Sequence, residues 1–453
     1  MTELVDVVVV GMGPGGEEVA GRLAEEGLDV IGIDSTLLGG ECPYWGCIPS
    51  KMMIRASNLL AEARRIPGIS GTSMVVPDWS PVAQRIREDA TDDWNDQVAV
   101  ERFEGKGGRF VRGQGRIVGP DAVEVGDRHI QVRRGIVLAT GARSWTPPIE
   151  GLADVPYWTN REAIEVTELP RSLVVIGGGA IALELGQVFS RFGVEVSILE
   201  AAERLIPVEE PEASALIESV FRREGIDIKT GVDFQRVSYD GTAFEVVLGN
   251  GEPLRSECLL VAAGRRPDLA SLGVEAIGLD SSLRLLSTDD HLRVAPGIWA
   301  VGDVTGIGAF THMALYQANI AVADILGNGG PVADYRAIPR VTFTDPEIGS
   351  VGLSEAAARS QGINVRVGIA QIPTSARGWI HKTGNDGLIK LIEDADRGIL
   401  IGALSAGPTG GEVLGLLSLA VHAEVPTSAM RTMIYAYPTF HRAVEDALTD
   451  LLS

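Results

Sequence analysis

Two copies of one local pattern constrain this chain more than any other feature. Each copy joins an apolar run, a glycine-rich turn, a helical stretch and a second apolar run that ends at an acid. The copies read VDVVVVGMGPGGEEVAGRLAEEGLDVIGID and SLVVIGGGAIALELGQVFSRFGVEVSILE. Continuous apolar runs are typical of strands buried on both faces, as in parallel sheets covered by helices. The sequence therefore predicts two βαβ units of an α/β fold.

The spacing inside each copy is typical of a dinucleotide site. The acid follows the first glycine by 23 residues in both copies, 34 − 11 and 200 − 177. In such a site the first glycine makes the turn and the second admits the pyrophosphate to the helix N-terminus. The acid accepts hydrogen bonds from the ribose hydroxyls. We therefore expect two bound dinucleotides. The motif residues are Gly11, Gly13, Gly16 and Asp34 in the first copy, and Gly177, Gly179, Ala182 and Glu200 in the second.

Two of the chain's three cysteines, Cys42 and Cys47, lie together in GGECPYWGCIPSKMM. Structural zinc needs four ligands, but the third cysteine, Cys258, lies alone in CLLVAAG, and no two of the six histidines have H-x₃₋₅-H spacing. We therefore predict no metal site, and a reversible disulfide between Cys42 and Cys47 is the other possibility, which the rest of the sequence has to decide. Two dinucleotides and a redox cysteine pair suggest FAD in one site and a nicotinamide in the other.

Composition excludes several other classes of protein. The formal charge of −22 argues against a nucleic-acid partner or an anionic membrane surface. No apolar run approaches the ~20 residues of a membrane span. The start MTELVDVVVVG has no basic segment, so we expect no signal peptide and a cytoplasmic protein. A cysteine pair in that compartment is expected to be catalytic or redox-sensing.

With these motifs in place, the chain resembles the pyridine nucleotide–disulfide oxidoreductases over nearly its whole length. The family stretch G-G-x-C-x₃-G-C-[IV]-P-[ST]-K corresponds to GGECPYWGCIPSK, and GIVLATGA, GIWAVGDV, VAAGRRPD and VTFTDPEIGSVGL resemble further family segments. The resemblance implies two Rossmann-like dinucleotide-binding domains plus a C-terminal α+β dimerisation domain, and a homodimer. The implied domains are 1–148 with 266–330 for FAD, 149–265 for NAD(P) and 331–453 for dimerisation.

The resemblance also implies roles for individual residues. Cys47 would be the thiolate against the flavin ring, stabilised at a helix N-terminus, and Cys42 would exchange with the substrate. Lys51 would lie near the flavin and pair with Glu184, and Asp303 would bind FAD. The other positions expected to bind cofactor are Gly15, Gly40, Thr140, Gly141, Gly264, His312 and Ala314.

The second βαβ unit favours NAD(H) over NADP(H). Glu200 would accept from a ribose 2′-hydroxyl and repel a 2′-phosphate. The loop after it reads EAAERL, in which Arg204 is the one arginine. Ala182 at the third motif position is common among NADP users and points the other way, but the carboxylate is the stronger effect.

One segment departs from the family pattern. Disulfide-exchanging members end with H-P-T-x-x-E, whose histidine moves the proton between thiol and thiolate. Here the segment reads AYPTFHRAVEDAL, so Tyr437 replaces the histidine and Arg442 replaces the glutamate. Tyrosine, with an ordinary pKa near ~10, is a poor base at neutral pH. By resemblance we expect a cis bond before Pro438, and we expect Tyr437 to line the partner subunit's acceptor pocket.

The reaction we expect is FAD-dependent electron transfer between NAD(P)H, the Cys42–Cys47 couple and a small disulfide or dithiol substrate. In this reading His441, four residues past Tyr437, moves the proton. A mercuric-reductase-like enzyme is an alternative, although the ending DLLS lacks the cysteine pair those enzymes use. Direct transfer from the flavin to a quinone is a third candidate, and a flavin-containing NAD(H) sensor without turnover is a fourth. Tyr44 and Trp45 either shape an acceptor pocket or pack internally.

Overall fold

The computed structural model describes residues 2–452, which group into two compact units. The first unit contains the residues up to Pro49, Gln84–Trp145 and Gly264–Asp334. The second contains Ser50–Ala83, Thr146–Ala263 and the residues from Tyr335 onward. The first unit is discontinuous, as is the expected FAD domain. The domain limits at 148, 265 and 330 remain a prediction.

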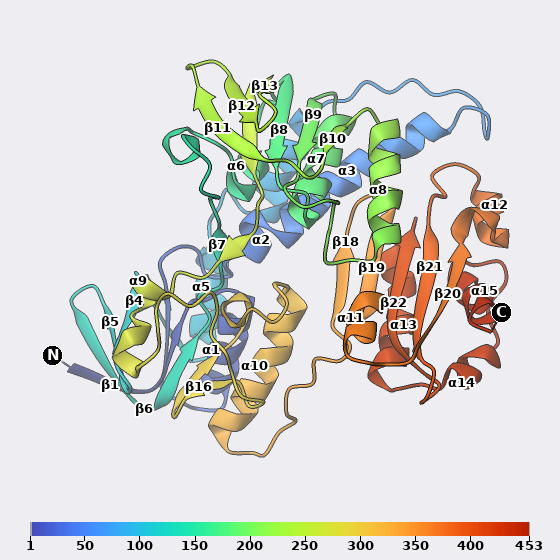
Figure 1. Cartoon of the computed structure of the whole chain (residues 1–453). Helices are drawn as coiled ribbons and strands as arrows, with labels where there is room; N and C mark the ends of the chain where they lie inside the picture. Colours follow the sequence, from blue (N-terminus) through green and yellow to red (C-terminus); the bar gives the residue numbers. More distant parts are fainter. Residues whose placement is uncertain (1, 453) are drawn as a thin grey trace. The chain divides into compact units, whose positions relative to one another are not determined.

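The first unit is built on an eight-stranded sheet (Figure 1). Its main path runs in the order β16-β17-β6-β1-β2-β3, and β4 and β5 extend it from β6. Neighbouring strands from β17 to β3 are parallel. The strands are β1 (Thr2–Val10), β2 (Val30–Asp34), β3 (Arg109–Arg112), β4 (Gly115–Gly119), β5 (Ala122–Val125), β6 (Arg128–Leu138), β16 (Arg293–Ala295) and β17 (Ile298–Ala300). A short pair, β7 (Arg143–Ser144) with β15 (Arg265–Arg266), lies outside this sheet.

Helices cover the sheet because its central strands are apolar on both faces. Val7, Val8 and Val9 of β1 are fully buried, which confirms the prediction from the run VDVVVV. Helices α1 (Pro14–Glu25) and α10 (Thr311–Leu326) lie side by side over one face in Figure 1 and share one apolar core. The other helices of this unit are α2 (Glu41–Trp45), α5 (Gln97–Gly105), α9 (Leu269–Leu272), the π-helix η1 (Ile86–Ala90) and the 3₁₀ turns η3 (Val274–Ile277) and η4 (Asp303–Thr305).

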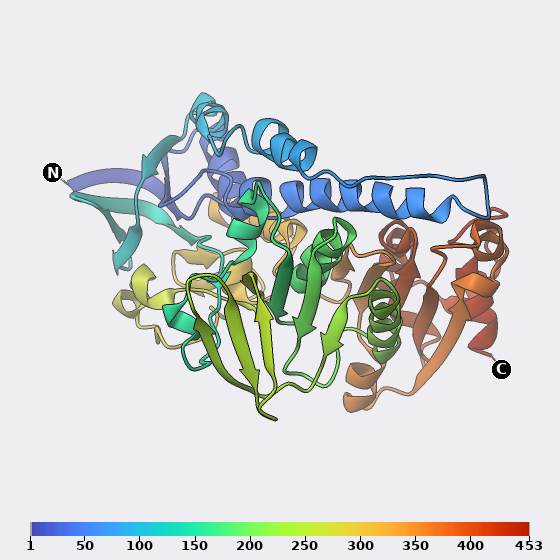
Figure 2. The same cartoon turned by 90° about the horizontal axis from the view of Figure 1, so that it is seen from above.

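The second βαβ pattern forms a smaller parallel sheet in the second unit, in the order β10-β9-β8-β14. A three-stranded antiparallel sheet, β11-β12-β13, comes between β10 and β14 along the chain and is drawn in yellow-green in Figure 2. The elements of this part are η2 (Leu152–Asp154), α6 (Asn160–Glu165), β8 (Ser172–Ile176), α7 (Ala180–Arg191), β9 (Glu195–Leu199), α8 (Pro211–Arg223), β10 (Asp227–Lys229), β11 (Phe234–Tyr239), β12 (Phe244–Leu248), β13 (Pro253–Ser256) and β14 (Cys258–Val261).

The C-terminal part of the second unit is an antiparallel sheet in the order β18-β19-β22-β21-β20 (Figure 1). Helices α13 and α15 pack on it and share its apolar core. The elements are β18 (Pro339–Thr342), β19 (Glu347–Gly352), α11 (Glu355–Ser360), β20 (Val365–Gln371), η5 (Ile372–Thr374), α12 (Ala376–His381), β21 (Leu388–Asp394), β22 (Ile399–Gly407), α13 (Gly410–His422), α14 (Thr427–Arg431) and α15 (Ala443–Asp450).

The chain passes from the first unit to the second within helix α3 (Cys47–Arg65), after Pro49. It returns to the first unit within α4 (Ser80–Arg85), after Ala83. The predicted fold class is confirmed: two Rossmann-like regions and a C-terminal α+β region. Within residues 2–452, no helix combines the length and apolar character needed to cross a membrane.

Candidate active site

The first glycine loop leaves open space at the start of α1. Gly11 has φ +93°, and a side chain there would collide with the backbone carbonyl of Ala139. Gly13 differs, because a Cβ at that position would meet no atom within 4 Å. Gly13 is also the N-cap residue of α1, so no N-cap side chain accepts from the first backbone amides of the helix. The backbone amides of this helix start are therefore open to an anion, which suits a pyrophosphate.

The second glycine loop repeats this geometry. Gly177 has φ +116°, and a side chain there would collide with the carbonyl of Ala262. Around Gly179 a Cβ would again meet nothing within 4 Å, and no side chain caps α7. Ala182, at the third motif position, is fully buried. The two predicted dinucleotide loops therefore share one geometry in two separate units.

The two acids are also held alike. Oδ2 of Asp34 accepts the Met12 N–H at 2.7 Å, and Oδ1 accepts the Thr36 N–H at 2.8 Å. Glu200 accepts the Gly178 N–H through Oε2 and the Ala202 N–H through Oε1 at 2.7 Å. In each copy the donors are the residue after the first glycine and the residue two past the acid. This fixes the carboxylate beside its glycine loop, where a ribose hydroxyl is expected.

The remaining positions predicted to bind cofactor lie in the first unit, mostly around the same loop. Gly15 packs against Ala314 of α10, and Gly40 has φ +66° where a Cβ would lie 2.7 Å from the Cα of Gly13. Gly141 and Gly264 also have positive φ, +65° and +118°, with open space where a Cβ would be. Thr140 is exposed next to Gly141. These close approaches explain why glycine is needed at Gly40.

Asp303 and His312 lie at two further turns of the first unit. Burial raises the pKa of the Asp303 carboxyl above its ordinary value, and the positive charge of Arg265 opposes this. Asp303 starts η4 directly after Gly302, whose N–H donates to Gln317 at 2.7 Å. His312 is exposed at the start of α10, with its ring stacked on Phe310. Gln317 is fully buried and was not predicted, since it lies inside a helix without a motif.

Cys42 and Cys47 lie next to each other in the reduced state. Cys42 is in α2, and Cys47 is the first residue of α3. A hydrogen bond with Cys47 raises the pKa of the Cys42 thiol, and burial adds to this, while a contact with Thr311 opposes it. Tyr44 and Trp45 between the cysteines are buried, with ring centroids 5.9 Å apart. Of their two predicted roles, the structure favours internal packing.

Sequence reasoning did not find Thr311. Its Oγ1 lies 3.4 Å from Sγ of Cys47, and it is the first residue of α10. The Cys47 sulfur is thus close to the N-terminal ends of α3 and α10, whose dipoles and amides stabilise a thiolate. The one sequence feature that could have pointed to Thr311 is its place directly before His312, which was predicted to bind cofactor.

The predicted ion pair between Lys51 and Glu184 is confirmed. Nζ of Lys51 lies 2.8 Å from Oε2 of Glu184. The Glu184 side chain is 8% exposed and the Lys51 side chain 37%. Lys51 is four residues past Cys47 in α3, which is about one helical turn. Neither residue is the solvated surface charge that its type alone would suggest.

The C-terminal segment has the expected cis bond between Tyr437 and Pro438. Tyr437 is 70% exposed, and the Arg442 guanidinium lies 5.5 Å from its ring centroid. His441 lies in a turn before α15. Its Nε2 lies 3.4 Å from Oγ1 of Thr439. Proline at position 438 and the turn after it interrupt helical geometry.

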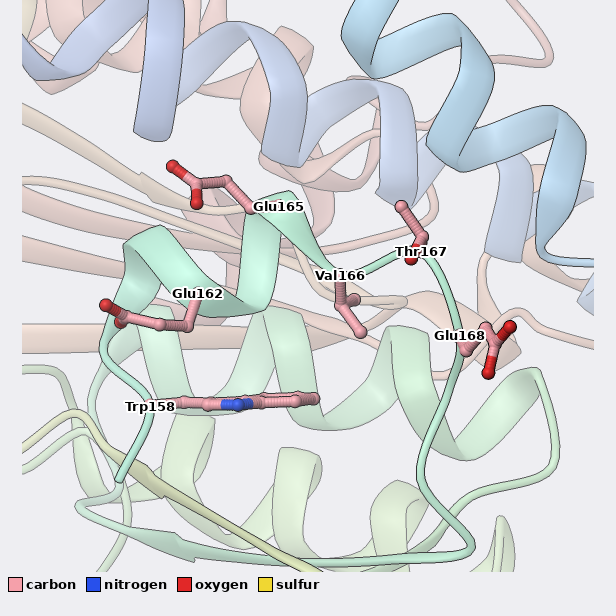
Figure 3. A pocket seen from close by; sticks show the side chains of 6 residues that line it. All are labelled: Trp158, Glu162, Glu165, Val166, Thr167 and Glu168. Atoms are coloured by element: carbon pink, nitrogen blue, oxygen red, sulfur yellow. The ribbon is translucent and has the colours of Figure 1, made fainter. Parts of the chain in front are cut away.

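No cluster of three or more metal-ligating side chains occurs within residues 2–452. The second unit also carries a surface recess of about 340 Å³ (Figure 3). Trp158 and Glu162 line one side of it, and the other lining residues are Glu165, Val166, Thr167 and Glu168. Three carboxylates would repel a phosphate, so this recess is unsuited to a dinucleotide.

Comparison with known families settles which family these parts form. A family model described as pyridine nucleotide-disulphide oxidoreductase matches residues 5–318. The model of that family's dimerisation domain matches residues 338–448. The chain belongs to the pyridine nucleotide-disulphide oxidoreductases. It is therefore an FAD-dependent NAD(P)H disulfide oxidoreductase, and the open start of α1 in the first unit fits the pyrophosphate of FAD.

Relatives within the pyridine nucleotide-disulphide oxidoreductases cover nearly the whole chain. A dihydrolipoyl dehydrogenase of Chlorobaculum tepidum is 32% identical, over 99% of this chain and 97% of the relative. A mercuric reductase of Staphylococcus aureus is 30% identical, over 92% of this chain and 77% of the relative. A solved Cu(II) complex of RclA, a flavoprotein disulfide reductase of Escherichia coli induced by HOCl, has a TM-score of 0.87. It is 27% identical, with 99% of each chain covered.

Proposed function

We propose that the enzyme passes electrons between NAD(H), FAD and the Cys42–Cys47 couple, and exchanges them with a small disulfide or dithiol substrate. The observation that carries this proposal is the adjacency of the two thiols, with Cys47 at two helix N-termini. An adjacent thiol pair can close to a disulfide and open again, which a buried structural cysteine does not need to do.

FAD, when bound, would carry the two electrons between the nicotinamide and the Cys42–Cys47 pair. The chain's own residues divide the remaining work. Asp34 and Glu200, fixed by the Met12 and Gly178 N–H groups, accept from the ribose hydroxyls, and the open helix starts hold the pyrophosphates through backbone amides. Lys51, fixed by Glu184, places a positive charge one helical turn after Cys47.

In the direction of disulfide reduction, Cys42 attacks one substrate sulfur and the other substrate sulfur leaves as a thiol. Cys47 then attacks Cys42, which closes the protein disulfide and releases the second thiol. Two electrons pass from the dithiol to the substrate. The raised pKa of Cys42 means that a base must take its proton. We assign that role to His441 of the partner subunit, and we place Tyr437 at the wall of the acceptor pocket.

Geometry around Glu200 supports NAD(H) rather than NADP(H). The carboxylate is fixed by two backbone N–H groups where a 2′-phosphate would otherwise lie. Arg204 is engaged elsewhere, because it donates to the Ser214 hydroxyl at 2.6 Å and the Pro207 carbonyl at 2.7 Å. A guanidinium bound in this way is poorly placed to pair with a phosphate.

The proposed assembly is a homodimer that works in the cytoplasm. Its C-terminal part matches the family's dimerisation domain. Large apolar side chains on this part are strongly exposed, with Ile434 at 96% and Trp379 at 76%. A second copy would cover such side chains. We also propose the domain limits 148, 265 and 330 for the FAD, nicotinamide and dimerisation domains.

A soft metal ion is the second candidate acceptor. Tyr437 stands where a proton-shuttling histidine is expected for thiol exchange, and mercuric reductases are among the relatives. Two adjacent thiols also suit a soft cation as substrate. This reading keeps Cys42 and Cys47 as the electron donors and dispenses with His441.

The test is a steady-state comparison of wild type with a Cys42→Ser/Cys47→Ser double variant. Lipoamide, low-molecular-weight disulfides, mercuric ion and quinones are offered with NADH and with NADPH. The proposal predicts turnover of a disulfide with NADH, lost in the variant. Mercuric turnover alone, lost in the variant, would select the second candidate. Full retention with quinones would instead mean that electrons leave the flavin directly.

A further inference from the structure

Helix α7 is attached along one face to the segment between β18 and β19. The Oε1 atom of Glu184 accepts the Phe343 N–H at 2.8 Å. Gln187 makes two hydrogen bonds to the Asp345 backbone, accepting the N–H at 2.8 Å and donating to the carbonyl at 2.9 Å. Because Gln187 and Arg191 follow Glu184 by three and seven residues, all three share one helix face.

Helix α3 joins the same network at regular intervals. Lys51 pairs with Glu184, Asn58 accepts from Arg191 at 2.7 Å, and Arg65 pairs with Asp345 at 2.6 Å. These α3 positions are seven residues apart, which is about two helical turns. The position of Lys51 is therefore set from several points along α3 and not by Glu184 alone.

Phe343 contacts this ion pair twice. Its backbone N–H holds the Glu184 oxygen that does not bind Lys51. Its ring centroid lies 4.6 Å from the Lys51 Nζ, so the ammonium lies over an aromatic face. The ammonium thus has a carboxylate and a ring as neighbours, with the Ser50 hydroxyl at 3.3 Å. Together they restrict a long, flexible side chain to one orientation.

We propose that Phe343 is a positioning residue for electron transfer, and that its ring fixes the Lys51 ammonium toward the bound flavin. This inference rests on the proposed function, since it takes Lys51 to act beside the flavin. A fixed positive charge favours reduction of a neighbouring group that gains negative charge, and a mobile one does so less. Loss of the ring would lower the rate of flavin reduction without changing which atoms react.

The test uses the FAD-loaded enzyme and anaerobic stopped-flow reduction by NADH. Phe343→Leu keeps the backbone N–H and removes the ring, and we expect the flavin reduction rate to fall about fivefold. Phe343→Trp restores a ring face and should recover most of the rate. Phe234→Leu is the matched control. Phe234 is another half-buried phenylalanine of the second unit, on β11, and its loss should leave the rate unchanged.

A graded series avoids reliance on a variant that fails to fold. Phenylalanine carrying one, two or three fluorines at position 343 keeps its shape and weakens the ring's attraction for a cation. The rate and the flavin reduction potential should fall stepwise along the series. An unchanged rate across the series would overturn the role of the ring. If Lys51→Met also leaves the rate unchanged, the proposed place of Lys51 beside the flavin fails instead.

Discussion

Lys390 and Glu210 form an ion pair of 2.7 Å in which both side chains are almost fully removed from solvent, with 2% and 5% exposed. Lys390 lies in β21 of the C-terminal sheet, and Glu210 directly precedes α8, which follows the second βαβ pattern along the chain. Glu212 and Glu355 lie 2.8 and 2.9 Å from the same ammonium. One buried cation therefore joins two parts of the second unit.

Replacing Lys390 with methionine is expected to destabilise the second unit strongly. The variant leaves three carboxylates without their common cation, and breaking a buried pair costs about 3–5 kcal/mol. Chemical denaturation of the FAD-loaded protein should show a clear loss of stability. Lys106→Met is the control, because its partly exposed 3.4 Å contact with Glu25 should contribute less than about 1 kcal/mol. Equal effects of the two variants would contradict the buried network.

The same network predicts a pH dependence. Hydrogen bonding to Lys390 lowers the pKa of Glu355 below its ordinary 4.5. A carboxyl whose pKa is lowered by folding stabilises the fold at pH values above its pKa in the unfolded chain. This contribution disappears as the pH falls through its pKa in the folded protein. The stability advantage of wild type over Glu355→Gln should be full near pH 7 and shrink below about pH 4.5. Thermal melts of both proteins at several pH values measure it. A constant difference across this range would refute the assignment.

Alanine in the two open glycine positions should separate the two cofactors. A Cβ at Gly13 or Gly179 meets no protein atom, so both variants are expected to fold. Gly13→Ala should reduce FAD retention, because the Cβ stands where the first pyrophosphate would approach. Gly179→Ala should keep FAD and raise the KM for NADH. Absorbance of the purified proteins and steady-state kinetics measure the two effects. Loss of FAD in both variants would show that the two loops are not separate sites.

Glu200 is expected to set the nicotinamide preference. Glu200→Ser should lower kcat/KM for NADH roughly tenfold, because a hydrogen bond to a charged group contributes about 1.5–3 kcal/mol. Activity with NADPH should rise, since the repulsion of a 2′-phosphate is gone. Glu203→Ser, on the same loop, serves as the control and should change neither value much. An unchanged ratio of NADH to NADPH activity in Glu200→Ser would remove the basis for the NAD preference.

The parts of the fold that could be predicted are those with a local signal. Both βαβ units follow from apolar runs and glycine spacing within about thirty residues, and the structure places Asp34 and Glu200 as expected. The Lys51–Glu184 pair spans 133 residues and was predictable only through the family resemblance.

Several contacts leave no local trace in the sequence. Phe343 meets Glu184 across 159 residues and Lys390 meets Glu210 across 180, and no spacing rule connects such positions. Thr311 could not be placed beside Cys47 for the same reason.

The most direct test of the account is to count the electrons taken up during anaerobic titration of the FAD-loaded enzyme with dithionite. If Cys42 and Cys47 form a working disulfide in contact with the flavin, wild type should accept two electron pairs per FAD. The Cys42→Ser/Cys47→Ser variant should accept one pair. Uptake of a single pair by the oxidised wild type would contradict the account.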